Sequence, residues 1–202
     1  MTKPIIAIDI DDVLSSQVQV LIEFSNENYG TTLTTGDFKA PGEYWGYYEQ
    51  IWNVGKEEGA QRFQDFLERK IPLRQIIAPE TLALLTKLKK DFRLEIVTSR
   101  RADYHTATQE WLEKHAPAIF DGVHFVELWD KSDRKVTKAM ICQEIGAGYL
   151  VDDSVDHCNL AAEAGITALL FGEFGWNIAN ALSPGVYRVK DWTEVETYLY
   201  GK

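Results

Sequence analysis

The chain of 202 residues is poor in cysteine, in basic residues relative to acidic ones, and in long apolar runs. It has two cysteines, and Cys142 has no CxxC or CxxH neighbour. A disulfide framework or a zinc site is therefore not expected, and a reducing compartment is the simpler interpretation. No segment approaches the ~20 apolar residues that a membrane span needs, and the N-terminus runs directly into an apolar stretch without a basic leader. We therefore expect a cytoplasmic protein without a membrane partner.

The charge balance limits the class of partner. There are 31 acidic and 21 basic residues, so the formal net charge is −10. This balance argues against a nucleic-acid polymer or an anionic membrane surface as a partner. It remains compatible with a small phosphorylated substrate, because local cations or a metal ion can reverse the field inside a cleft. The length fits one domain, or a core that carries a smaller insertion.

Short apolar runs alternate with helical patterns along most of the chain, which is typical of an α/β domain with a mainly parallel sheet. The predicted strands are Pro4–Ile10, Arg93–Thr98, Gly122–Leu128, Tyr149–Val151, Thr167–Phe171 and a weaker one at Val186–Val189. The predicted helices that follow them are Glu80–Lys90, Tyr104–His115, Thr137–Ile145, Val155–Ala164 and Trp192–Tyr200. Most of the strands have no polar face, so helices are expected to cover both sides of the sheet.

Residues 15–78 interrupt this alternation. They contain no convincing buried strand, but a helix pattern at Val18–Tyr29, an aromatic and glycine-rich section, and a second helix pattern at Glu57–Lys70. A helical insertion directly after the first strand is typical of a small separate lid. We therefore predict an α/β core formed by residues 1–14 and 79–202, with residues 15–78 as a helical cap.

Acidic side chains follow the first predicted strand. Because side chains alternate along a strand, Asp9 and Asp11 are expected on one face, while Ile10 points into the core. Two like charges this close repel each other unless a cation or a shared proton compensates. An acidic turn at a strand end is the alternative. A functional site is favoured, because open α/β sheets bind ligands at the carboxyl edge of their strands.

A second apolar strand ends in the same way, at Asp152 and Asp153. Together with Asp9 and Asp11, these residues would bring four aspartates to one edge of a parallel sheet. That arrangement is electrostatically unfavourable without a hard divalent cation. Oxygen-only ligation suits Mg²⁺, which takes few carboxylates and keeps water or substrate phosphate in its shell. The sequence therefore predicts a magnesium site at this edge.

Hydroxyl and cationic groups stand at two further places. Thr98, Ser99 and Arg100 end the second predicted strand, and Lys138 opens the helix that leads to Asp152. Hydroxyls and a cation suit a phosphoryl oxygen, and a helix N-terminus with an ammonium group forms an anion site. Taken singly, Thr98 also fits a cap, and Lys138 a solvated surface lysine.

In chain order, the four elements are Asp9 to Val13, the strand-end pair Thr98-Ser99, Lys138, and the strand-end pair Asp152-Asp153. In that order they resemble the motif set of the haloacid dehalogenase superfamily. The resemblance covers residues 4–14 and about 79–175. Asp11 matches the phosphatase branch, because the dehalogenase branch lacks this second carboxylate, and Asp12 stands where the family frequently has glycine. The resemblance implies a three-layer, Rossmann-like α/β domain with a mainly parallel sheet and a small α-helical cap inserted after the first strand.

The resemblance also implies residue roles in a phosphoric monoester hydrolase. Asp9 looks like the nucleophile that forms an aspartyl-phosphate. Asp11 looks like the general acid that protonates the leaving oxygen and then activates water. Mg²⁺ would be held by Asp9, the backbone carbonyl of Asp11, and either Asp152 or Asp153.

The phosphoryl oxygens would be bound by Thr98, Ser99 and Lys138. Lys135, one helical turn before Lys138, is the alternative lysine. Arg100 would reach a phosphate or a sugar, or pair with an acidic residue of the cap.

The insertion occupies the place of the family's specificity cap. Its aromatic residues, Tyr44 and Trp45 among them, would either stack on a nucleobase or form the core of the cap. The short helical cap and the Thr98-Ser99 pair are similar to the pyrimidine 5′(3′)-deoxyribonucleotidases. The expected substrate is a small phosphorylated metabolite, and this resemblance implies a 5′-(deoxy)nucleotide as one candidate. A monomer or homodimer is expected.

Three alternatives remain open from the sequence. A phosphatase for sugar phosphates or another small metabolite would use the same core, since the core contacts only the phosphoryl group. A non-catalytic module for metal or phosphate binding is disfavoured by the intact motif residues. A receiver-type signalling domain is disfavoured by the insertion and by Asp11. His157 and His105 are predicted to be helix-surface residues without a role.

Overall fold

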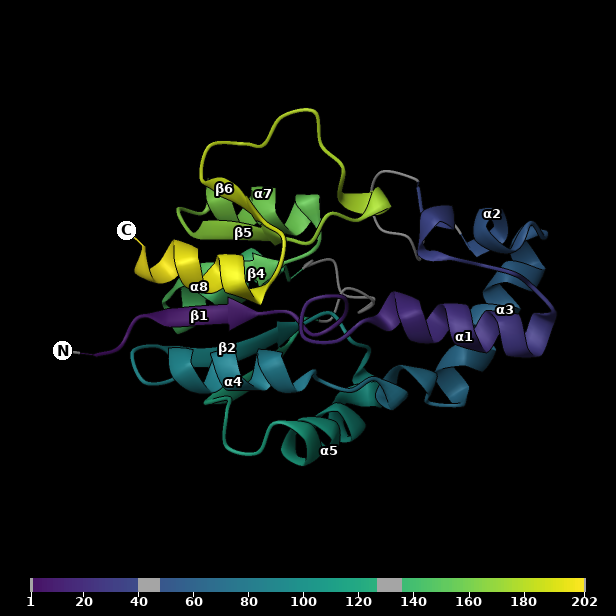
Figure 1. Ribbon diagram of the computed structural model, residues 1–202, viewed down its shortest axis with the longest axis horizontal. Helices are drawn as coiled ribbons and strands as arrows, with labels where there is room; N and C mark the ends of the chain where they lie inside the picture. The colour runs from purple at the N-terminus through teal and green to yellow at the C-terminus, as the bar shows by residue number, and fades with distance from the viewer. Residues whose placement is uncertain (1, 40–47, 127–135, 202) are drawn as a thin grey trace.

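The computed structural model describes residues 2–39, 48–126 and 136–201. Within these ranges, six parallel strands form one sheet in the order β3-β2-β1-β4-β5-β6 (Figure 1). The strands are β1 Ile5–Ile8, β2 Arg93–Thr98, β3 Gly122–Phe125, β4 Ala147–Asp152, β5 Thr167–Phe171 and β6 Val186–Val189. All six predicted strands are present; the last two residues of the one predicted at Gly122–Leu128 lie outside the described ranges.

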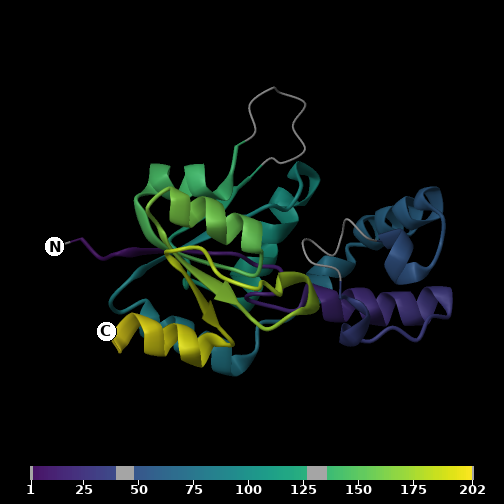
Figure 2. The same cartoon turned by 90° about the horizontal axis from the view of Figure 1, so that it is seen from above.

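Helices cover both faces of the sheet, as the apolar strands predict (Figure 2). Ile6 and Ile8 of β1 pack into one hydrophobic cluster, and Ala7 between them packs into a second cluster on the opposite face. The first cluster includes side chains from α4 Pro79–Leu88, α5 His105–His115 and α8 Trp192–Tyr200. The second cluster includes side chains from α6 Lys138–Ile145 and α7 Val155–Glu163. The three-layer α/β fold is thereby confirmed.

The register of the central strands decides which residues meet at the carboxyl edge. Ile8 of β1 pairs with Ile96 of β2 on one side and with Val151 of β4 on the other. The residues that follow these partners therefore emerge side by side. The strand order also reverses direction between β1 and β4, where open α/β sheets form a crevice for ligands.

The described part of residues 15–78 lies beyond this carboxyl edge (Figures 1 and 2). Its α-helices are α1 Gln17–Tyr29, α2 Tyr48–Trp52 and α3 Lys56–Glu68, with 3-10 turns at Thr35–Asp37 and Ile71–Arg74. They enclose a third hydrophobic cluster that includes Phe24, Phe66 and Trp52. Phe38 and Trp52 are buried in this cluster, so both pack as core residues. Tyr44 and Trp45 lie outside the described residues.

The helical segment also contacts the core through a turn after β5. Trp176, in the 3-10 turn Gly175–Asn177, joins the same cluster as Phe38. The approach is close, because a Cβ atom on Gly175 would lie 1.9 Å from the carbonyl oxygen of Phe38. Only glycine fits this contact. In the part of the chain that the structure describes, no helix is both long and apolar enough to cross a bilayer.

Candidate active site

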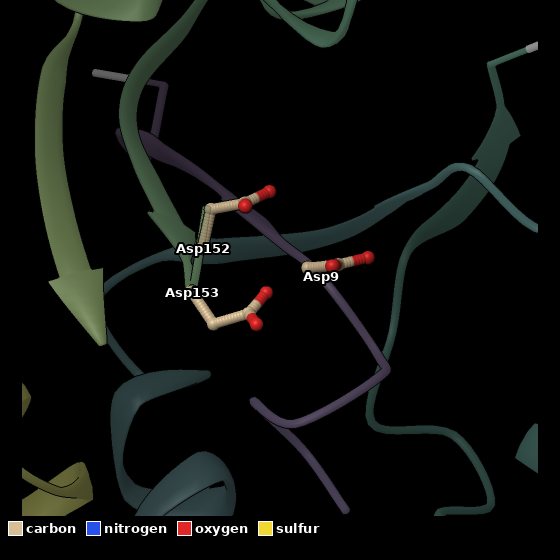
Figure 3. Close-up of side chains that lie close together, drawn as sticks. All are labelled: Asp9, Asp152 and Asp153. Carbon is tan, nitrogen blue, oxygen red and sulfur yellow. The ribbon is translucent and has the colours of Figure 1, made fainter. Parts of the chain in front are cut away.

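Three aspartates meet where β1 and β4 end. Asp9 follows β1, and Asp152 and Asp153 stand at the end of the neighbouring β4. Figure 3 shows their carboxylates projecting to the same side of the two strand ends. One oxygen atom from each residue lies within 4.8 Å of the others, and all three residues are buried. The structure thus brings together three of the four aspartates that the sequence indicates as metal ligands.

Lys138 lies inside this acidic cluster. It is the first residue of α6, and the Thr137 side chain caps the helix by accepting a hydrogen bond from the Met140 backbone N–H. Lys138 Nζ lies 2.8 Å from Asp9 Oδ2 and 2.7 Å from Asp152 Oδ2. Burial by itself lowers the pKa of Lys138, but Asp152 and Asp9 raise it well above its ordinary value. With 2% of its surface exposed, Lys138 is not a solvated surface lysine.

Asp152 has hydrogen-bond partners on both carboxylate oxygens. Oδ2 contacts Lys138, while Oδ1 accepts a hydrogen bond from the Ser154 backbone N–H at 2.9 Å and lies 3.2 Å from His157 Nδ1. Burial by itself raises the pKa of Asp152, but Lys138 and His157 hold it well below its usual range. Asp152 is therefore a fully ionised side chain that fixes Lys138.

Asp153 has different neighbours from Asp152. The Trp176 indole N–H donates to Asp153 Oδ2 at 2.7 Å, and the Asn177 side-chain amide donates to the Asp153 backbone carbonyl at 3.1 Å. Burial, and after it the charge of Asp152 and other nearby carboxylates, raises the pKa of Asp153 well above its usual range. Asp153 is a buried acid without a cation of its own among the described residues.

Asp9 is the third member of the cluster. Its backbone N–H donates to the Val151 carbonyl at 3.0 Å, which fixes the start of the loop after β1. Burial raises the pKa of the Asp9 side chain from 3.8 to about 6; Lys138 opposes this rise, and Asp152 adds to it. Two buried carboxylates, Asp9 and Asp152, thus share one ammonium group, with Asp153 beside them. This crowding of like charge is what a divalent cation relieves.

The Asp11 carboxylate is not part of the cluster of three aspartates, and the predicted metal contact of Asp11, through its backbone carbonyl, stays a prediction. Its Oδ2 accepts a hydrogen bond from Arg100 Nε at 2.9 Å, and its Oδ1 accepts one from Arg100 Nη2 at 2.6 Å. The Gln75 side-chain amide donates a third bond to Oδ1 at 3.2 Å. Asp11 nevertheless lines the same cavity as Asp9.

Asp12 has a structural contact that explains its position. Its φ angle is 59°, in the left-handed region that glycine adopts without strain. The Asp12 carboxylate also accepts hydrogen bonds from the Val18 backbone N–H at 3.0 Å and from Ser16 Oγ at 3.2 Å, at the start of α1. Asp tolerates this backbone conformation better than most residues and satisfies N–H groups at the beginning of the helix.

Hydroxyl groups stand next to the carboxylates at the end of β2. Thr98 is buried, and its Oγ1 accepts a bond of 3.4 Å from the Arg100 backbone N–H. Ser99 Oγ is buried and has no hydrogen-bond partner among the described residues. Both residues line the cavity. A buried hydroxyl without a partner indicates a polar ligand, because leaving such a group unsatisfied is unfavourable.

The cavity measures about 130 Å³ and lies between the sheet edge and the helical segment. Asp9, Asp11, Thr98 and Lys138 line the side of the sheet. The side of the helical segment is mainly apolar and consists of Gln17, Phe63, Leu67 and Pro72. Tyr104 also lines the cavity, and its hydroxyl donates to the Leu67 carbonyl, which ties the core to α3. Lys135 lies outside the described residues.

Three polar residues of the site were not found from the sequence. The expectation that His157 is a helix-surface residue is wrong, since it is buried and faces Asp152. Gln75 stands where the chain returns from the helical segment, and no local pattern marks it. Trp176 is separated from Asp153 by 23 positions.

Comparisons with known proteins show the family and the fold. The family model described as 5′ nucleotidase, deoxy (pyrimidine), cytosolic type C protein matches residues 3–201. A haloacid dehalogenase-like family hydrolase from Streptococcus pneumoniae is 17% identical, with a TM-score of 0.66 and 99% of each chain covered. A predicted phosphatase from Clostridium acetobutylicum is 15% identical, with a TM-score of 0.68 and 100% of each chain covered.

The magnesium-bound protein YfnB from Bacillus subtilis is 14% identical, with a TM-score of 0.63, and the match covers 99% of this chain and 100% of that one. The comparison with curated proteins gave no match. At these identities the solved structures show the fold, and the family model, which spans nearly the whole chain, shows the family. The chain belongs to the family of 5′ nucleotidase, deoxy (pyrimidine), cytosolic type C proteins, and it is a phosphoric monoester hydrolase on the haloacid dehalogenase fold.

Proposed function

We propose that the enzyme hydrolyses a small phosphate monoester, preferably a deoxynucleoside 5′-monophosphate, through an aspartyl-phosphate on Asp9. The observation that carries this proposal is the arrangement at the end of β1. A buried carboxylate, Asp9, lies 2.8 Å from the ammonium group of Lys138 and lines a cavity together with Asp11 and two hydroxyl residues. A nucleophile, an acid and groups that bind an anion thus border one small space.

The side chains present fit a magnesium ion. Asp9, Asp152 and Asp153 offer oxygen ligands within 4.8 Å of one another, and oxygen is the ligand that Mg²⁺ prefers. Asp153 is a better candidate than Asp152, because both oxygens of Asp152 already have partners. We propose Asp9, Asp153 and the backbone carbonyl of Asp11 as the holders of Mg²⁺. When bound, Mg²⁺ would neutralise negative charge on the transferring phosphoryl group. The magnesium-bound structure of the similar protein from Bacillus subtilis supports magnesium as the metal.

The phosphoryl oxygens would be bound opposite the carboxylates. An ammonium group has three N–H donors, and Lys138 directs two of them at Asp9 and Asp152. The third is left for a phosphoryl oxygen. Ser99 Oγ, which has no partner among the described residues, and Thr98 Oγ1 would supply two further hydrogen bonds. These groups would stabilise the charge of the transition state.

The reaction would proceed in two transfers. Asp9 attacks phosphorus, the bond between phosphorus and the ester oxygen breaks, and Asp11 gives a proton to the leaving alcohol. In the second transfer Asp11 takes a proton from water, the water oxygen attacks phosphorus, and the carboxylate of Asp9 leaves. Inorganic phosphate and an alcohol are the products, and both aspartates return to their starting state.

Residues 15–78 would act as the cap that selects the substrate. Phe63, Leu67 and Pro72 form an apolar wall opposite the phosphate-binding groups, which suits the flat body of a nucleoside. The family description, a nucleotidase for deoxy pyrimidine compounds that is cytosolic, supports a nucleotide and a cytoplasmic location. A phosphatase for sugar phosphates is the alternative outcome of the substrate test.

The proposal is tested by phosphate release from deoxynucleoside 5′-monophosphates, sugar phosphates and p-nitrophenyl phosphate, with Mg²⁺ and with EDTA. Wild type and Asp9→Asn are compared, and Asp156→Asn, which changes an exposed aspartate of α7 near the site, is the matched control. We expect turnover that requires Mg²⁺, a preference for deoxynucleotides, and a loss of at least about 1,000-fold in Asp9→Asn.

Hydrolysis that survives in Asp9→Asn, with deamidation excluded by mass spectrometry, would contradict the aspartyl-phosphate route. A preference for sugar phosphates would leave the mechanism in place and replace the proposed substrate. Absence of turnover on every substrate, by folded enzyme with Mg²⁺ present, would overturn the proposal.

A further inference from the structure

The Arg100 side chain is buried next to the site and is held by contacts with other residues of the protein. The residue stands in the loop after β2, and its side chain is 5% exposed. The Nη1 group donates to Thr108 Oγ1 of α5 at 3.4 Å, and the guanidinium lies over the Trp111 ring, 5.6 Å from its centroid. Two residues of α5 thus fix the position of the guanidinium from the side away from the cavity.

Two further N–H donors of Arg100 contact Asp11. Nε donates to Oδ2 at 2.9 Å and Nη2 donates to Oδ1 at 2.6 Å, which is the two-point geometry that fixes the plane of a carboxylate. Burial by itself lowers the pKa of Arg100, but Asp11 raises it above its ordinary value. The guanidinium therefore stays charged, and it holds Asp11 in one orientation.

The two oxygens of Asp11 are not equivalent. Oδ1 accepts hydrogen bonds from both Arg100 and Gln75, which fills its two acceptor sites. Oδ2 accepts a bond from Arg100 alone among the described residues, so one of its acceptor sites is left. The Gln75 amide is itself fixed, because its Oε1 accepts a bond from Ser15 Oγ at 2.5 Å.

We propose that Arg100 is a positioning residue for Asp11, which orients the carboxylate so that Oδ2 exchanges the proton with the leaving oxygen. This inference rests on the proposed function, in which Asp11 is the general acid and base. Arg100 already uses three of its five N–H donors within the protein, two of them on Asp11, so its main task is to orient Asp11.

The proposal predicts a dependence on the leaving group. The alkoxide of a nucleoside is a strong base and needs a proton as it leaves, whereas p-nitrophenolate is a stable anion at neutral pH and leaves without one. Loss of a correctly oriented acid therefore slows nucleotide hydrolysis much more than hydrolysis of p-nitrophenyl phosphate. A general loss of structure would slow both reactions by similar factors.

The test measures kcat/KM for a deoxynucleoside 5′-monophosphate and for p-nitrophenyl phosphate, because kcat/KM includes only the steps up to release of the leaving group. Arg100→Gln is expected to lose about 100-fold on the nucleotide and less than about 5-fold on p-nitrophenyl phosphate. Asp11→Asn should show the same selectivity. The double variant should be no slower than Asp11→Asn, because both changes remove one function.

Two further variants keep the test decisive. Arg101→Gln removes the same charge from the next residue, which lines the cavity but pairs with Asp103 and Gln64 instead of Asp11. It should change both kcat/KM values by the same factor. Arg100→Lys keeps the charge without the two-point contact, so its loss on the nucleotide should be intermediate. It decides the question if Arg100→Gln does not fold, as judged by its unfolding midpoint.

Equal losses on both substrates in Arg100→Gln and Arg100→Lys would overturn the assignment of Arg100. Such a result differs from failure of the proposed function, which would show in the wild type or in Asp9→Asn.

Discussion

Aspartates stand at the ends of both β1 and β4, but their contacts differ. After β1, Asp9 faces the acidic cluster, Asp11 is paired with Arg100, and Asp12 caps α1. At the end of β4, Asp152 is saturated by Lys138, Ser154 and His157, while Asp153 receives an indole N–H. After β1, Asp9 and Asp11 thus line the site while Asp12 holds the start of α1; at the end of β4, Asp153 lines the site while Asp152 holds Lys138.

The difference shows that surroundings, and not residue type, set the charge state of each aspartate. The pKa of Asp152 is held below its usual range because Lys138 and His157 outweigh burial. The pKa of Asp9 is raised to about 6 although it contacts the same lysine, because burial dominates there. One ammonium group cannot fully compensate two buried carboxylates. Asp9 and Asp153 are left with the charge that a metal ion is suited to neutralise.

The largest expected effect comes from removing the cation that both strand ends share. Lys138→Met leaves Asp9 and Asp152 buried without their partner. The free energy of unfolding should fall by about 3–5 kcal/mol, measured by urea denaturation in EDTA. Lys87→Met, which removes a largely exposed lysine paired with Glu196, should change it by less than about 1 kcal/mol. Similar losses in the two variants would show that Lys138 is not the shared partner.

The next effect is a pH dependence of the free energy of unfolding, which distinguishes Asp9 from Asp152. Because the folded-state pKa of Asp9 is raised from 3.8 to about 6, the folded protein binds this proton more tightly than the unfolded chain does. Asp9 therefore makes the metal-free protein less stable as pH rises from about 4 to about 6. Asp9→Asn removes this contribution.

In EDTA at pH 8, Asp9→Asn should be more stable than wild type by up to about 3 kcal/mol, and the difference should shrink toward pH 5. Urea denaturation of both proteins at the two pH values measures it. A difference that does not change with pH would show that Asp9 titrates as it does in the unfolded chain.

Mg²⁺ affinity tests whether Asp153, which follows β4, or Asp152, its last residue, is the metal ligand. Asp153→Asn removes a proposed ligand and should weaken Mg²⁺ binding at least about 10-fold in isothermal titration calorimetry. Asp156→Asn, an exposed residue in the first turn of α7, is the control and should bind Mg²⁺ with wild-type affinity. If Asp153→Asn bound Mg²⁺ with wild-type affinity, the metal ligand would be Asp152 and not Asp153.

The smallest effect concerns the third aspartate after β1. Asp12→Ala loses the bonds to Val18 and Ser16, and alanine tolerates the φ of 59° less well than aspartate does. It should lower the free energy of unfolding by about 1–2 kcal/mol. Asp12→Gly loses the same bonds without the backbone strain, so its loss should be smaller. Equal losses in the two variants would assign the whole effect to the hydrogen bonds.

The sequence predicted those parts of the site that local pattern controls. Apolar runs located the strands, so Asp9, Thr98 and Asp152 could be placed at one edge before any coordinates. Lys138 was found because it opens a helix just before β4. The contact of Arg100 with Asp11 crosses 89 positions and could not be found in this way. His157 was misjudged because a helix position by itself does not say which face is buried.

The sequence by itself determined the alternation of strands and helices, the helical insertion after the first strand, and the acidic strand ends. These features follow from periodicity and from the order of residues along the chain. Only the tertiary structure decided which aspartate pairs with Lys138, which pairs with Arg100, and which remains without a cation among the described residues. Strand register and helix packing set those distances, and at buried sites electrostatic interactions depend on distance and burial more than on residue type.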